Sequence, residues 1–273
     1  MFSFSKIGFA RLNTYFSLGI LPFFFFLLYP LISQAQFASR IRTARPSATM
    51  GTYTVGKNVL QWQTGLQLRE RQTEQDSSQI FQYKTVIRLG ILEHWEVNGG
   101  VNYQKDQSEA GNTREQHEGL SALRLGTRYH FFDGEGFLKA GAIQGRFWIP
   151  VPDEDYHRPA LGGRIMASVG YRLAPKLGLI TNAGWRWSGD GLPPTAFFSL
   201  RFSQVINKQW VLVADYFSPF KRFEPDYALG IGYHLTPSLK LDIAIGLLGQ
   251  TGQHDRYIEV GFATRFDWRH TDS

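Results

Sequence analysis

The chain has 273 residues, no cysteine and a formal net charge of +6. The lack of cysteine excludes a disulfide framework, a thiolate metal site and a lipid-modified cysteine. Hydrophobic residues make up 43% of the chain, yet the mean hydropathy is -0.24, which does not fit a protein built from membrane helices. This composition does fit a membrane barrel, because half of each strand then faces a polar lumen.

The N-terminus contains the longest apolar run of the sequence, residues 15–32. Lys6 and Arg11 precede the run, and small residues ending at Ala35 follow it. This order predicts a secretory signal over residues 1–35, and an uncleaved membrane anchor is the alternative. No other apolar stretch approaches the ~20 residues of a spanning helix. The mature chain is therefore expected to cross a membrane by strands or not at all.

Residues 36–58 precede the first predicted strand. They carry three arginines, Arg40, Arg42 and Arg45, together with turn formers such as Gly51 and Gly56. The sequence leaves two locations open for this segment, namely the periplasm or the barrel lumen, where it would act as a plug.

Residues 59–268 consist of segments of roughly ten residues in which apolar and polar side chains alternate. The breaks between them alternate between short (93–94, 133–136, 174–175, 207–208 and 236–238) and long (72–79, 104–118, 150–159, 188–195, 217–226 and 249–255). This pattern predicts an all-β fold, a transmembrane antiparallel up-and-down β-barrel of about 12 strands with periplasmic termini. Residues 269–273 form a C-terminal tail.

A soluble β-sandwich also shows alternating strands, with its apolar face turned inward. Two features favour the barrel. The polar faces are rich in small residues, which suits the concave side of a curved wall. Aromatic residues such as Trp95, Trp210 and Trp148 lie at strand ends, as they do in interfacial girdles. The phase is least clear in strand 137–149, because three small residues follow one another at 140–142.

Basic residues predominate on the predicted inward faces. The candidate lumen-lining residues are Arg88, Arg128, Arg164, Arg186, Asp215 and Asp242. Such residues can form a positively biased passage for anions, or they can form ion pairs that mainly hold the barrel's shape. Arg88, Arg128 and Arg164 lie well inside their strands and are the candidates for lining a constriction.

Other classes of function have weaker support. His130 and His234 face inward near the short turns, with Asp215 on a nearby strand, and these residues are the candidates for a lipid-modifying enzyme. A structural role for the histidines is the more common case. The acidic loop residues 153–155 are candidates for binding divalent cations. The basic residues do not form one stripe with stacking aromatics, so nucleic acid is rejected as a partner. No cofactor is expected.

Several short motifs resemble an outer-membrane family described as a putative MetA pathway of phenol degradation. They include Arg45-Pro46, the strand Leu60-Gln61-Trp62-Gln63-Thr64-Gly65, and the late strand Tyr227-Ala228-Leu229-Gly230-Ile231-Gly232-Tyr233. Gln63 and Asp215 depart from the family pattern, which tends to have Glu at both positions. The resemblance implies a transporter-like barrel for small solutes.

We therefore expect a passive channel in the outer membrane of a Gram-negative bacterium, with aromatic or anionic solutes as candidate classes. Its partners would be outer-membrane lipid, the barrel-assembly machinery and a small solute of unknown identity. A non-conducting structural or surface-binding barrel is the alternative, and a lipid-modifying barrel enzyme ranks third.

Overall fold

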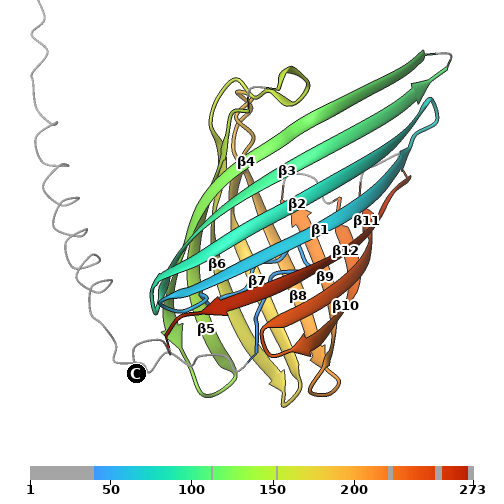
Figure 1. Cartoon of the computed structure of the whole chain (residues 1–273). Helices are drawn as coiled ribbons and strands as arrows, with labels where there is room; N and C mark the ends of the chain where they lie inside the picture. The colour runs from blue at the N-terminus through green and yellow to red at the C-terminus, as the bar shows by residue number, and fades with distance from the viewer. Residues whose placement is uncertain (1–39, 112, 152, 221–223, 250–253, 270–273) are drawn as a thin grey trace, which may run out of the picture. The chain divides into compact units, whose positions relative to one another are not determined.

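The structure is a computed structural model that describes residues 40–111, 113–151, 153–220, 224–249 and 254–269. These residues form a single closed barrel (Figure 1). The strands are β1 (Val59–Gln72), β2 (Asp76–Leu92), β3 (Trp95–Ala110), β4 (Thr113–Asp133), β5 (Leu138–Ile149), β6 (Gly162–Ala174), β7 (Leu177–Trp187), β8 (Thr195–Val205), β9 (Trp210–Pro219), β10 (Asp226–Thr236), β11 (Leu239–Leu248) and β12 (His254–Asp267). A short 3-10 helix, η1 (Glu154–Tyr156), lies between β5 and β6.

Every strand pairs antiparallel with its neighbours in the chain, and β1 closes the ring by pairing with β12 from Val59↔Asp267 to Gln72↔His254. The predicted antiparallel up-and-down barrel is thus confirmed. The connections 93–94, 134–137, 175–176, 206–209 and 237–238 share one rim, here called the turn rim. The connections at the opposite end of the strands form the loop rim.

The two faces of the wall differ as the alternation predicts. On β11, Leu241, Ile243 and Ile245 are exposed on the outside, whereas Lys240 and Asp242 are buried on the lumenal side. Alternate residues of a strand point to opposite faces, so the outer surface becomes an apolar belt. Apolar area of this extent on a single molecule marks a surface that contacts lipid or another apolar partner.

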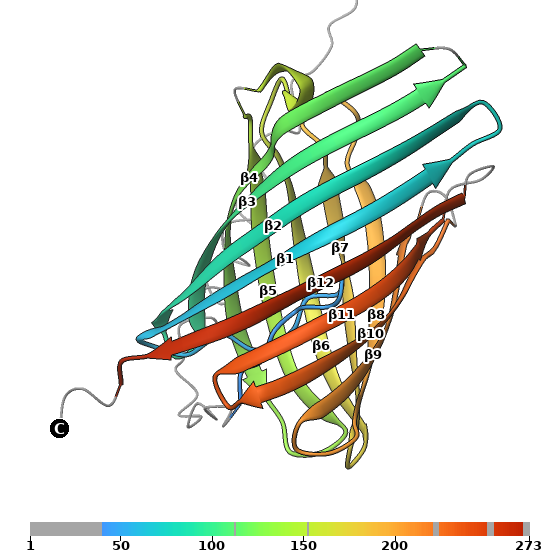
Figure 2. The same ribbon diagram turned by 45° about the vertical axis from the view of Figure 1, so that its right-hand side comes forward.

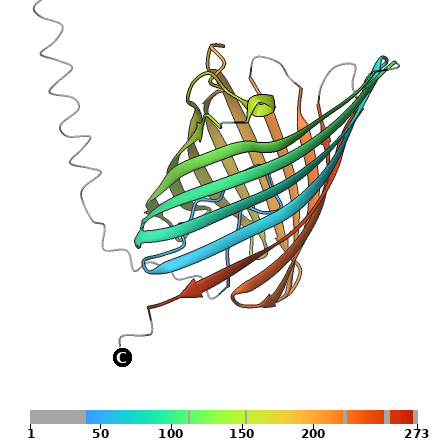
Figure 3. The ribbon, with the colours of Figure 1, turned by 45° about the horizontal axis from the view of Figure 1, so that its top comes forward.

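Strands β2, β3 and β4 are longer than the alternation suggested. They have 17, 16 and 21 residues and extend beyond the rest of the loop rim (Figures 1, 2 and 3). The predicted long breaks at 72–79 and 104–118 are therefore wrong, because most of these residues belong to strands. Their side chains are polar and pair across strands, as Lys105 does with Glu118 at 3.2 Å. The alternation of apolar and polar side chains ends at the edge of the apolar belt, whereas the backbone pairing of β2, β3 and β4 continues beyond it. For this reason the alternation underestimates the length of these strands.

The predicted signal, residues 1–35, lies outside the described residues, as does most of the predicted C-terminal tail. Within the part of the chain that the structure describes, no helix is long and apolar enough to cross a membrane.

Residues 40–58, here called the lumenal segment, run inside the barrel (Figures 2 and 3). Small residues of the wall make room for this segment. Gly65 and Gly261 lie opposite each other on β1 and β12, and a Cβ atom on either would collide with the Arg45 guanidinium. The small inward residues noted in the sequence therefore allow a close approach between wall and segment.

Candidate functional site

The lumenal segment is anchored to β11 and β12 by Arg45. Its guanidinium lies 3.1 Å from Asp242 Oδ1 and 2.6 Å from Glu259 Oε1. Lys240 Nζ donates to the Arg45 carbonyl oxygen at 2.7 Å. Charge-assisted hydrogen bonds of this kind are stronger than neutral ones, so this wall holds the segment firmly.

A second anchor lies on β8 and β9. The carboxylate of Asp215 accepts hydrogen bonds from Ser47 Oγ at 2.9 Å and from the Ala48 backbone N–H at 2.7 Å. Arg201 Nη1 donates to the Ala44 carbonyl oxygen at 3.1 Å. The segment forms no strand, so its backbone N–H and carbonyl groups need other hydrogen-bond partners when they are buried. Asp215 and Arg201 supply two of these partners.

The third anchor is a buried ion cluster on β2, β3 and β4. Glu96 is fully buried and binds Arg88 through two hydrogen bonds of 2.9 and 2.6 Å. Arg128 lies 3.4 Å from the same carboxylate, and both arginines donate to the Tyr53 carbonyl oxygen. Glu96 also accepts from the Val55 backbone N–H at 3.0 Å. The cluster thus binds the segment and the wall as one unit.

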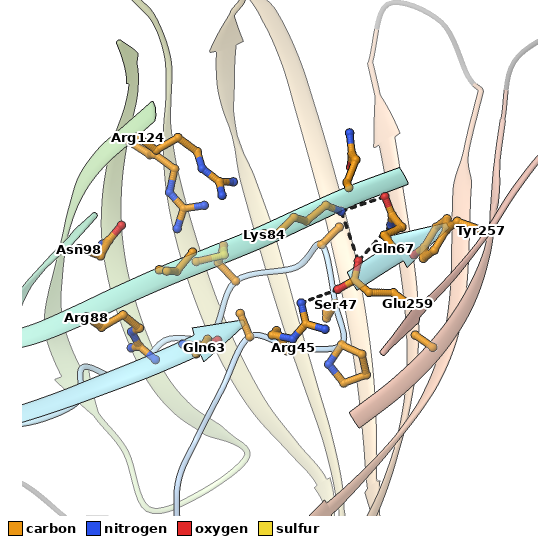
Figure 4. A pocket seen from close by; sticks show the side chains of 18 of the residues that line it. Arg45, Ser47, Gln63, Gln67, Lys84, Arg88, Asn98, Arg124, Tyr257 and Glu259 are labelled. Atoms are coloured by element: carbon orange, nitrogen blue, oxygen red, sulfur yellow. Dashed lines mark hydrogen bonds and ion pairs between the residues drawn. The ribbon is translucent and has the colours of Figure 1, made fainter. Parts of the chain in front are cut away.

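The segment separates two cavities. The loop-side cavity has a volume of about 380 Å³ and is lined by Gln67, Lys84, Arg124, Arg146 and Tyr257, among others (Figure 4). The turn-side cavity has a volume of about 590 Å³, and its lining includes Arg172, Lys176 and Lys208. Arg45, Arg88 and Arg128 line both cavities, so these three side chains lie at the division between them.

Four further arginines form a basic wall on β4 to β7, here called the arginine wall: Arg124, Arg146, Arg164 and Arg186. Arg146 pairs in register with Arg164, and Arg164 pairs with Arg186. Among the described residues, no carboxylate lies within ion-pair distance of these guanidinium groups, and Arg124 donates to Asn102 Oδ1. The buried Nε atoms of Arg124 and Arg164 lack hydrogen-bond partners there. The arginine wall therefore carries positive charge that no carboxylate of the described residues neutralises, and two of its members, Arg124 and Arg146, line the loop-side cavity.

An apolar cluster adjoins the arginine wall. Phe197 is buried with Met50 and Met166, and its ring stacks on Phe217 with centroids 5.4 Å apart. The Arg186 guanidinium lies 5.5 Å from the centroid of the Phe217 ring. The lumen thus offers apolar and cationic surface side by side, a combination that suits an amphiphilic anion.

The candidate residues from the sequence occupy different parts of this site. Arg88 and Arg128 belong to the ion cluster, Asp215 and Asp242 bind the lumenal segment, and Arg164 and Arg186 belong to the arginine wall. Arg88 and Arg128 line both cavities, whereas Arg164 lines neither of them. Asp215 binds Ser47 and His130 contacts Thr52, so the described contacts do not unite His130, His234 and Asp215.

Two residues that line the loop-side cavity, Arg146 and Arg45, could not be found from the sequence, and a third lumenal residue, Trp148, was placed on the wrong face. Arg146 was missed because the phase of its strand is blurred at 140–142, although Gln144 and Arg146 alternate with the exposed Ile143 and Phe147. Arg45 lies outside the strand pattern altogether. Trp148 was assigned to the outer girdle, and this is wrong, because it shares the inward face with Arg146 and lies beneath Arg158.

A closed antiparallel barrel with an apolar belt and a charged lumen defines the class of barrel proteins built to span a membrane. The chain belongs to the family described as "Putative MetA-pathway of phenol degradation", whose model matches residues 43–266. This match confirms the resemblance found in the sequence. No curated protein matches the chain.

Three solved structures with a similar fold are each distant in sequence from this chain. The COG4313 outer membrane channel from Pseudomonas putida F1 has a TM-score of 0.59 at 8% identity, covering 80% of this chain and 99% of that one. The translocator domain of autotransporter NalP from Neisseria meningitidis has a TM-score of 0.51 at 14% identity, covering 76% and 88%. The KdgM porin has a TM-score of 0.51 at 6% identity, covering 74% and 99%. At such identities, the likeness concerns the fold.

Proposed function

We propose that the protein is an outer-membrane channel that passes small anionic solutes with an apolar or aromatic body by passive diffusion. The observation that carries this proposal is the arginine wall, which faces the lumen without carboxylate partners beside an apolar cluster. Like charges placed side by side in a low-dielectric lumen repel one another, and an anion between them relieves that repulsion. The family description, which names phenol degradation, and the channel and porin among the similar folds support this proposal.

The proposal includes a route to the outer membrane. Residues 1–35 would direct secretion, both termini would lie in the periplasm, and the assembly machinery would insert the barrel into lipid. The apolar belt supports this placement, because its large hydrophobic side chains are exposed on the outside of the barrel. The loop rim, with the extended β1–β4 hairpins, would then face outward.

In the proposed channel, the lumenal segment controls passage. Arg45, Arg88 and Arg128 line both cavities, so a solute that moves from one cavity to the other must pass them. Transport then requires the part of the segment near Arg45 to move away from β11 and β12. The ion cluster around Glu96 holds the part near Tyr53 and Val55 in place.

The alternative is a non-conducting barrel whose rim binds a surface partner. The lumenal segment favours this alternative, because it lies across the lumen between the two cavities. A lipid-modifying enzyme has less support, because Asp215 is engaged by the segment and does not orient a histidine. We therefore propose a channel rather than an enzyme.

The test is ion selectivity in planar bilayers. The purified wild-type protein under a KCl gradient should give a reversal potential that indicates preference for chloride. A triple variant, Arg146→Gln, Arg164→Gln and Arg186→Gln, should lose most of that preference while retaining current. Arg114→Gln is the matched control, because Arg114 is 68% exposed and pairs with Glu109 on the strand extension.

Two outcomes would contradict the proposal. An unchanged reversal potential in the triple variant would show that the arginine wall does not select anions. The absence of current in both the wild type and an Arg45→Ala variant with a weakened anchor would favour the non-conducting alternative.

A further inference from the structure

We propose that His94, His130 and Asp133 form a binding site for a divalent transition-metal ion at the turn rim. His94 lies in the turn between β2 and β3, and the other two residues end β4. One ligand atom from each residue lies within 4.8 Å of those of the others. The backbone fixes this arrangement, because the His130 N–H donates to the His94 carbonyl oxygen at 2.8 Å.

The environment of His130 orients its ring toward such an ion. His130 is 4% exposed, and its Nδ1 lies 3.1 Å from the Thr52 carbonyl oxygen. A carbonyl oxygen only accepts hydrogen bonds, so Nδ1 carries a proton. When Nδ1 holds the single proton of a neutral imidazole, Nε2 presents a lone pair to an ion. Metal-binding histidines are commonly held in this way by a carbonyl at the other ring nitrogen.

The contact between Nε2 and Asp133 supports the site. Nε2 lies 2.9 Å from Asp133 Oδ2, yet it is buried and has no partner of hydrogen-bond geometry among the described residues. A lone pair and a carboxylate repel at this distance, and either a shared metal ion or a proton on Nε2 removes that repulsion. Ligands at roughly 2.05 Å from one ion are about 2.9 Å apart at a 90° angle and about 3.3 Å apart in a tetrahedron.

The third ligand needs only a side-chain adjustment. The rings of His94 and His130 are nearly parallel, at 15°, with centroids 5.6 Å apart. One His94 nitrogen already lies within 4.8 Å of the other two ligand atoms, and in the proposed site a rotation of the side chain would bring it to the ion. Two imidazoles and one carboxylate suit Zn²⁺, Ni²⁺ or Cu²⁺, whereas Mg²⁺ and Ca²⁺ prefer oxygen ligands.

The site has a structural consequence for the lumen. His130 contacts the Thr52 carbonyl and stacks on the Tyr53 ring at 5.2 Å, and both residues belong to the lumenal segment. An ion at Nε2 would therefore stiffen the connection between the segment and the turn rim. The competing explanation is an ion pair between protonated His130 and Asp133, which does not need His94.

The experiment is calorimetric titration of Zn²⁺ into the tag-free mature protein folded in detergent. We expect one Zn²⁺ per chain, with affinity reduced about tenfold or more in His94→Ala and in Asp133→Asn. His234→Ala is the matched control, since His234 also lies near the turn rim but outside the cluster, and it should bind as the wild type does. Zn²⁺ should raise the melting temperature of the wild type but not that of His94→Ala.

His94 is the primary variant because it lies in a surface turn, whereas replacement of the buried His130 could disturb folding. Circular dichroism of each variant verifies that the barrel has formed. Failure of the folded wild type to bind Zn²⁺ stoichiometrically would overturn the proposal. Equal binding by wild type and His94→Ala would overturn it as well, and would favour the ion pair. Neither result depends on channel activity.

Discussion

At the scale of single residues, the Glu96 cluster shows how a charged lumen is stabilised. Removing a carboxylate from water is costly, and the cost is offset here because two arginines and the Val55 N–H all bind it. The same arginines hold the Tyr53 carbonyl oxygen. One buried acid therefore stabilises both the wall and the lumenal segment.

We expect Glu96→Gln to lower the free energy of unfolding by about 3 kcal/mol or more, because two buried arginines lose their counter-charge. Urea titration of the folded barrel in detergent measures this change. Glu109→Gln is the control, because Glu109 and Arg114 are 59% and 68% exposed and their pair should contribute less than about 1 kcal/mol. Equal small effects in both variants would contradict the role assigned to Glu96.

At the scale of elements, the lumenal segment differs from the strands because it is held mainly by side chains of the wall. Its anchors lie on β2, β4, β9, β11 and β12, among others. Each net hydrogen bond contributes about 0.5–1.5 kcal/mol, so loss of one anchor should loosen part of the segment without unfolding the barrel.

We expect Arg45→Ala to speed hydrogen exchange of the backbone amides near Ala48 and Thr49. Loss of the contacts to Asp242 and Glu259 should cost about 2 kcal/mol locally, which corresponds to roughly 30-fold faster exchange. Mass spectrometry of exchanged peptides measures this rate. Arg69→Ala is the control, because Arg69 pairs with Asp255 and does not bind the segment. Unchanged exchange in Arg45→Ala would mean that other contacts hold this part of the segment.

At the scale of the whole molecule, the barrel turns one face of every strand to its surroundings. Leu229, Ile245 and Leu247 are 61%, 57% and 61% exposed, and the opposite faces bury charge. Such an arrangement is stable only if the outer face meets an apolar medium, because water would penalise the exposed belt.

We expect Ile243→Arg to destabilise the barrel in lipid vesicles by about 2–4 kcal/mol, since Ile243 lies in the outer belt. Ser203→Arg should have a much smaller effect, because Ser203 lines the turn-side cavity. Urea unfolding in vesicles, followed by electrophoretic mobility, compares the two. Similar losses in both variants would show that the outer face does not meet hydrocarbon.

The sequence by itself determined the existence and the number of the strands and the direction of most side chains, but not the length of β2, β3 and β4. Alternation with period two is a local property, so Asp242 and Arg128 could be placed on the inward face from their own strands alone. The limits of this reasoning appear in strand β5, where small residues at 140–142 obscure the phase and concealed Arg146.

Only the tertiary structure decided which residues meet. Arg45 binds Asp242 across 197 positions of the chain, and the arginine wall arises because the registers of β5, β6 and β7 bring three arginines into one row. Register and closure depend on every strand at once, so no single segment encodes them. The location of residues 40–58 has the same origin, since a lumen exists only after the barrel has closed.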